Sequence, residues 1–281
     1  MSGELERVRK ALRELGKSLE SGTGDLAPES VHKLRTSSRR VEAIATVLDV
    51  AAQNKSRRLV KSIAPLRKAA GGVRDMDVLA ANARKLARYC AGESLTHLLA
   101  HLEIARQQNA RELQHAMHRR RKAALEALKE CSKCVQSALK REESKRVKSS
   151  AHSSAAASQR QEKIRSAAMH VVRELGNATP LDAHNLHEFR LNVKNLRYTL
   201  QLDENADHGL MSALGEAQRR IGDWHDWQQL EEIAHQVLVL EQDQSLLDRI
   251  GRTARRRFEA ALAAANALRG KYLAMPLAMG V

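Results

Sequence analysis

The chain has 281 residues, enough for one large domain or two small ones, and it carries a formal net charge of +15 at pH 7. This charge indicates an anionic partner, which is nucleic acid, an acidic membrane surface or a phosphate polymer; simple solubility is the alternative interpretation. Aromatic residues form 2% of the chain, which argues against the proteins that stack single-stranded bases on aromatic rings. A ligand made mostly of backbone phosphate fits the composition better.

Long runs rich in Ala, Leu, Glu, Lys and Arg, with only 4 Pro and 14 Gly, predict an all-α fold. In the first half, helices are expected at about residues 3–20, 29–49, 54–70, 75–90 and from 94 to beyond 125. A second series is expected at about 160–176, 181–203, 208–221, 226–241 and 244–270. Breaks within the two series are expected at glycines, such as Gly71 in the first and Gly222 in the second. The two series indicate an internal duplication.

Three segments follow from this organisation. Residues 1–148 are expected to form a first helical bundle ending in a basic connector helix, and residues 160–281 a second bundle. Between them, residues 149–159 are rich in Ser and Ala and are predicted to be a linker.

The N-terminus is charged throughout and lacks the apolar stretch and small-residue cleavage site of a secretory signal. Nowhere do 18 apolar residues follow one another, so a soluble, cytoplasmic protein without a membrane partner is expected. The three cysteines, Cys90, Cys131 and Cys134, fit a reducing compartment better than a disulfide framework.

A basic motif occurs twice. His32, Arg35 and Arg39 recur as His187, Arg190 and Lys194, and Arg197 extends the second copy. At about 100° per residue, offsets of 0, 3, 7 and 10 fall within an arc of roughly 80° on a helix. Each copy is therefore expected to form a basic stripe along one helix face, suited to an extended polyanion. We call His32, Arg35 and Arg39 the first basic stripe, and the four later residues the second.

The apolar residues place the two stripes differently. Leu34, Val41, Ile44 and Leu48 lie nearly opposite the first stripe, whereas Phe189, Val193, Leu196 and Leu200 lie beside the second. The second stripe is therefore expected nearer the packed interior, where water screens its charges less. That two ordinary solvated helix faces repeat this pattern by chance is the weaker interpretation.

A second repeated element follows each stripe by about 40 residues. AGGVRDMDVL aligns with IGDWHDWQQL, which pairs Gly71 with Gly222, Arg74 with His225 and Asp75 with Asp226. We expect each glycine to end one helix and each aspartate to cap the next by accepting hydrogen bonds from unpaired backbone N–H groups.

The residues of catalysis and metal binding are not arranged in known patterns. Neither His32 nor His187 has a His or carboxylate at the following i+3 or i+4 position, and Cys131-x-x-Cys134 lacks a second pair. No nucleophile motif, phosphate-binding Gly-rich loop or acidic metal cluster is visible. We therefore expect binding without turnover, no cofactor and no metal.

These motifs together resemble the CHAD family, the conserved histidine α-helical domain. The resemblance rests on four segments in the family's order: VHKLRTSSRR, AGGVRDMDVL, LHEFRLNVKNLRYTL and IGDWHDWQQL. It implies two helical bundles related by a pseudo-two-fold axis, with a central basic channel that binds inorganic polyphosphate, and association with polyphosphate granules without known catalysis. Glu42 departs from the family, because a basic residue is common at this position, which matches Arg197. It either shortens the first stripe or is the internal partner of a neighbouring cation.

The function expected from the sequence is therefore polyphosphate binding by a cytoplasmic protein on polyphosphate granules. The alternative is a nucleoid-associated protein that binds nucleic acid non-specifically through the same surface, and a polyphosphate-processing enzyme comes third. The candidate polyphosphate-binding residues are His32, Arg35, Arg39, Arg40, Lys61, Lys68, Arg74, His187, Arg190, Lys194 and Arg197.

Overall fold

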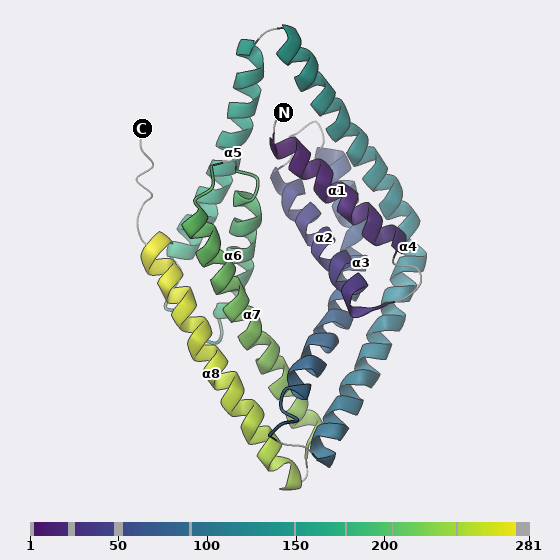
Figure 1. Ribbon diagram of the computed structural model, residues 1–281, viewed down its shortest axis with the longest axis vertical. Coiled ribbons are helices and arrows are strands. Elements are labelled where there is room, and N and C mark those ends of the chain that lie inside the picture. The colour runs from purple at the N-terminus through teal and green to yellow at the C-terminus, as the bar shows by residue number, and fades with distance from the viewer. Residues whose placement is uncertain are drawn as a thin grey trace. The chain divides into compact units, whose positions relative to one another are not determined.

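A computed structural model describes residues 3–21, 26–47, 53–89, 92–148, 150–177, 179–203, 205–239 and 241–273. Within these ranges the fold is all-helical and contains no strand, as predicted (Figure 1). The helices are α1 (Gly3–Ser21), α2 (Pro28–Val47), α3 (Gln53–Arg84), α4 (Glu93–Lys148), α5 (Ser150–Gly176), α6 (Leu186–Leu200), α7 (His208–Val237) and α8 (Gln244–Leu268). A short 3₁₀ turn (Glu241–Asp243) precedes α8, and a π-helical turn (Arg269–Leu273) follows it.

The predicted breaks at Gly71 and Gly222 were wrong. Both glycines lie inside continuous helices, α3 and α7, and neither has a positive φ. An interior glycine costs a helix only about 1 kcal/mol relative to alanine, which good helix formers on both sides offset. Asp75 and Asp226 are consequently interior helix residues, and their predicted capping role was wrong as well.

The predicted linker is also largely helical. Residue 149 lies outside the described ranges, but α5 begins at Ser150 and continues to Gly176. The alanines that suggested a segment without a core are also the strongest helix formers, and here this propensity prevails.

Close packing divides the chain into two compact units that do not follow the predicted boundaries at residues 148 and 160. Unit 1 comprises Met1–Arg74, Asn109–Met169 and Tyr198–Ala206, and unit 2 comprises Asp75–Gln108, His170–Arg197 and Asp207–Val281. Four helices, α3, α4, α5 and α6, contribute residues to both units. A long helix that serves two cores cannot be cut at a single position in the sequence.

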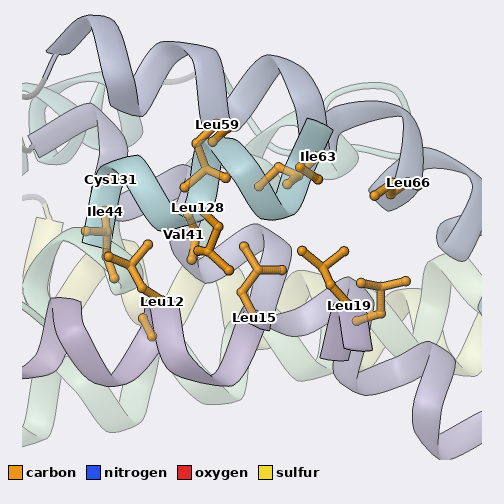
Figure 2. Packing of buried hydrophobic residues seen from close by; sticks show 14 of the residues in the cluster. Leu12, Leu15, Leu19, Val41, Ile44, Leu59, Ile63, Leu66, Leu128 and Cys131 are labelled. Atoms are coloured by element: carbon orange, nitrogen blue, oxygen red, sulfur yellow. The ribbon is translucent and has the colours of Figure 1, made fainter. Parts of the chain in front are cut away.

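Unit 1 has its own apolar core (Figure 2). Leucines of α1, such as Leu15 and Leu19, are fully buried beside Val41 of α2, Leu59 and Ile63 of α3. Leu128 and Cys131 of α4 complete this part of the cluster. Burial raises the pKa of the Cys131 thiol to about 11, with Cys134 adding to the effect, so Cys131 stays protonated at neutral pH.

Unit 2 is built mainly on the packing of α7 against α8. Its core joins Leu79 of α3 and Leu98 of α4 with Trp227 and Leu230 of α7 and Ile250 of α8. The start of α7 is capped by Asp207, whose carboxylate accepts a hydrogen bond from the Leu210 N–H at 2.5 Å. Among the described helices, none is sufficiently long and apolar to cross a membrane.

Candidate anion-binding site

The first basic stripe lies on one helix of unit 1, as predicted. His32, Arg35 and Arg39 all belong to α2, where His32 is exposed and the two arginines are half-buried. The opposite face carries buried Leu34, Val41 and Ile44, while Leu48 lies outside the described residues. Burial on one side and cations on the other are what an amphipathic helix at a core boundary requires.

A face of α3 lies against this stripe. Arg67, Gly71 and Arg74 follow at offsets of 0, 4 and 7, which puts them on the same side of the helix. A Cβ atom added at Gly71 would lie 3.7 Å from Nε of Arg35, in ordinary van der Waals contact. Arg67 Nη2 donates a hydrogen bond to Oε1 of Glu42 at 3.0 Å. The glycine therefore lies beside an arginine of the stripe and does not mark a helix end.

The histidine of this stripe lies in a positive environment. Partial burial lowers the pKa of His32 below its ordinary value, and the nearby charges of Arg74 and Arg35 lower it further. Protonation of His32 is therefore disfavoured in the protein without a bound anion. A bound anion would reverse this effect, because negative charge favours the protonated imidazole.

The second basic stripe lies on α6, within unit 2. Its apolar neighbours Phe189, Val193, Leu196 and Leu200 are buried, as predicted. Lys194 is 8% exposed and His187 is half-buried, so this stripe is more enclosed than the first. Charges in such a position are screened less by water and gain more from a bound anion.

A face of α7 lies against the second stripe. A Cβ atom added at Gly222 would lie 2.8 Å from Nη2 of Arg190 and 3.3 Å from its Cζ and Nε. The rings of His187 and His225 have centroids 4.4 Å apart. Arg197 Nη1 donates a hydrogen bond to Oε1 of Gln218 at 3.2 Å. The pKa of His225 is lowered to about 4, mainly by burial and in addition by the charges of His187 and Arg190.

The two helix pairs set three matched pairs of residues opposite one another in the same antiparallel order. In unit 1, the charge of Arg74 on α3 acts on His32 of α2, Arg35 lies against Gly71, and Glu42 accepts a hydrogen bond from Arg67. In unit 2, α6 meets α7 through His187 and His225, then Arg190 and Gly222, then Arg197 and Gln218. The same number of residues separates each matched residue of α2 from its counterpart in α6, and a second constant number separates those of α3 from their counterparts in α7. Each unit thus contains a basic helix pair, the name used below for α2 with α3 and for α6 with α7.

Three predicted candidates lie on α2 or α3 but point away from the contacts between these two helices. Arg40 turns towards α1, where its Nη1 contacts Oε2 of Glu14 at 2.5 Å. Lys61 and Lys68 are exposed on α3, each about 100° or more around the helix from Arg67. The remaining eight lie on the contacting helices of the two pairs.

Sequence reasoning missed Arg67 and Gln218. Extending the alignment of the two glycine elements by three residues towards the N-terminus would have set these two residues opposite each other. It would also have identified Arg67 as the cation that Glu42 neutralises, so the second interpretation of Glu42 is confirmed. Within the described ranges, no group of three or more His, Cys, Asp and Glu side chains is placed to hold a metal ion.

Comparisons with known proteins agree with the all-helical fold. The sequence model of a family described as the CHAD domain matches residues 6–235. The crystal structure of the CHAD domain from the plant Ricinus communis has a similar fold, with a TM-score of 0.59 at 18% sequence identity. The similarity covers 98% of this chain and 93% of that one. The curated proteins compared with this sequence gave no match.

Proposed function

Since this chain belongs to the CHAD domain family, we propose that it binds inorganic polyphosphate through its two basic helix pairs, without turning the polymer over. The observation that carries this proposal is the repeated contact register. Each unit brings a histidine, an arginine and a second-helix glycine together in the same order. A ligand with a repeating charge is matched by a protein with a repeating cationic site.

The arginines and lysines have distinct roles in this proposal. Arg35 and Arg190 both lie over glycines, and at Gly222 the absence of a side chain leaves the space that the planar guanidinium group of Arg190 occupies beside the backbone of α7. Such a group binds two phosphate oxygens at once, whereas Lys194 contributes a mobile point charge. The enclosed position of Lys194, 8% exposed, strengthens its attraction for an anion.

The placement of aromatic residues favours a phosphate polymer over nucleic acid. Trp224 and Trp227 are 4% and 2% exposed, so neither offers a face for stacking. Tyr89 is exposed, but Cζ of Arg249 lies 4.0 Å from the centroid of its ring. Proteins that hold single-stranded nucleic acid stack bases on exposed rings. The described part of this chain provides cations for phosphate groups and little surface for bases.

The proposal extends to features that the family resemblance implies. The matched contacts support an internal duplication, and the pseudo-two-fold axis and central basic channel stay predictions. Binding without catalysis is proposed because the sequence contains no nucleophile motif, phosphate-binding Gly-rich loop or acidic metal-cluster motif of the kind that phosphoryl transfer uses. Location on polyphosphate granules in the cytoplasm would follow from binding a polymer that gathers there.

The test is binding of fluorescent long-chain polyphosphate at physiological salt, with duplex DNA as competitor. A variant with His187→Ala, Arg190→Ala and Lys194→Ala should lose most of its affinity while keeping its helical circular dichroism. The matched control carries Arg252→Ala, Arg255→Ala and Arg256→Ala, which removes more positive charge from exposed positions of α8. The control should bind almost as wild type does, and DNA should compete poorly.

Two results would count against this function. If DNA displaces polyphosphate at equal phosphate concentration, the protein is a general polyanion binder of the nucleic-acid type. If the two triple variants lose affinity equally, the total charge of the chain binds the polymer and the basic helix pairs have no special role.

A further inference from the structure

The two basic helix pairs differ at their third contact. In unit 2, Arg197 donates to Gln218, a neutral side chain, at 3.2 Å. In unit 1, the matched positions hold Glu42 and Arg67, and here the arginine of α3 donates to the carboxylate of α2 at 3.0 Å. The arginine of this contact therefore lies on the first helix of the pair in unit 2 but on the second helix in unit 1. In unit 1 its partner is a carboxylate of the same chain.

The two arginines otherwise have similar surroundings. Nε of Arg67 and Nε of Arg197 are both buried, and neither makes a hydrogen bond to any residue that the structure describes. A buried donor of this kind costs free energy unless water or a ligand accepts its hydrogen bond. Each guanidinium therefore has one nitrogen donor that its side-chain contact leaves unpaired.

The charge of the third contact is the essential difference. Arg197 with Gln218 has a net charge of +1, whereas Arg67 with Glu42 is neutral overall. The side chains of Arg67 and Glu42 are 25% and 37% exposed, so their ion pair is partly screened by water. Glu42 continues the first basic stripe on α2, three residues after Arg39. A polyanion held by Arg35 and Arg39 would therefore meet Glu42 next.

We propose that Arg67 is a further anion-binding residue of unit 1 and that Glu42 is its internal competitor, which weakens the ligand affinity of that unit. This inference rests on the proposed function. Phosphate groups held by the neighbouring stripe have a high effective concentration at Arg67, and there they displace the Glu42 carboxylate. Glu42 thereby sets the affinity of unit 1 below that of unit 2, whose third contact has no acid to displace.

The direct test is Glu42→Gln, which gives unit 1 the Arg–Gln contact already present in unit 2. Its affinity for long-chain polyphosphate should rise about three- to fivefold, the factor expected for losing one exposed ion-pair competitor. The slope of log Kd against log salt concentration should steepen by about 0.7, as for one more phosphate charge neutralised, because Glu42 no longer offsets the charge of Arg67. The converse variant, Gln218→Glu, should weaken binding by a similar factor.

The matched control is Glu130→Gln. Glu130 pairs with Arg58 at 3.1 Å, also in unit 1 and also with an arginine of α3. Arg58 lies roughly 180° around α3 from Arg67 and about 13 Å along its axis, beyond a screening length of about 8 Å at physiological salt. Loss of the same charge at Glu130 should leave the affinity unchanged.

The outcomes separate this inference from the proposed function. If wild type does not bind polyphosphate, the proposed function fails and the role of Glu42 fails with it. If wild type binds but Glu42→Gln does not strengthen binding, or Glu130→Gln strengthens it equally, Glu42 does not compete for Arg67 and the proposed function is unaffected. Thermal unfolding of each variant checks that the fold is intact.

Discussion

Replacing the matched glycine of each unit by alanine should affect binding and stability differently in the two units. Gly71 and Gly222 occupy matched positions inside α3 and α7, where alanine would ordinarily stabilise the helix by about 0.5–1 kcal/mol. At Gly71 the new Cβ would lie 3.7 Å from Arg35 Nε, so the full gain is expected. At Gly222 it would lie 2.8 Å from Arg190 Nη2, closer than real Cβ atoms approach, so Arg190 must move.

The expected net effects follow from these distances. Forcing Arg190 out of its rotamer costs about 0.5–1.5 kcal/mol, which cancels the helix gain in Gly222→Ala. Misplacing one charge-assisted hydrogen-bond donor should weaken polyphosphate binding about tenfold, roughly 1.4 kcal/mol. Gly71→Ala should be more stable than wild type and bind equally well. Denaturant unfolding and fluorescence binding measure both quantities, and equal stabilisation by the two variants with unchanged affinity would refute the argument.

Three further predictions concern titration, packing and reactivity. The lowered pKa of His225, about 4, lies below its unfolded value of about 6.5. As pH falls, the His225 imidazole therefore takes up a proton in the unfolded chain before it does so in the folded protein, and stability should fall between about pH 6.5 and about pH 4. The free energy of unfolding, measured at pH 7 and pH 5, should depend less on pH for His225→Gln than for wild type. Leu15→Ala, at a fully buried core position, should destabilise the protein by about 2–5 kcal/mol, whereas Leu191→Ala on the exposed surface should cost under about 1 kcal/mol by the same unfolding assay. Cys131, with a pKa raised by burial to about 11, should be alkylated by iodoacetamide far more slowly in the folded protein than in urea at pH 7.5; equal rates would contradict its placement in the core.

The sequence was sufficient to predict the helical class and both basic stripes. Periodicity places His32 and Arg35 on one face of a helix, as it does His187 and Arg190, and the buried residues of α2 and α6 agree. These features depend on local geometry, which offsets along a helix determine directly.

The glycine elements were misread because glycine has two uses. At a helix end it supplies a positive φ, and inside a helix it lets another group approach the backbone. Gly222 has the second role, since Arg190 occupies the space of its missing side chain. One sequence contains no sign of which partner approaches, so the role of Gly222 emerged only from the contact between α6 and α7.

Local sequence patterns likewise could not predict which residues far apart in the sequence would pair in the folded protein. Arg40 was named as a candidate polyphosphate-binding residue, but it lies about 100° around the helix from Arg39, and its partner is Glu14 of α1. Arg67 was overlooked because it belongs to no motif on its own helix. Its significance comes from Glu42, which lies 25 residues earlier and reaches it only in the folded unit.

The central claim is that arginines of the basic helix pairs hold the phosphate groups directly, and the salt dependence of affinity tests it most directly. Polyphosphate affinity should be measured at several salt concentrations for wild type and for a variant with Arg190→Ala and Arg197→Ala. Each lost phosphate contact should reduce the slope of log Kd against log salt concentration by about 0.7, so the variant should be less steep by about 1.4. A variant that binds as tightly as wild type with the same slope would contradict the account.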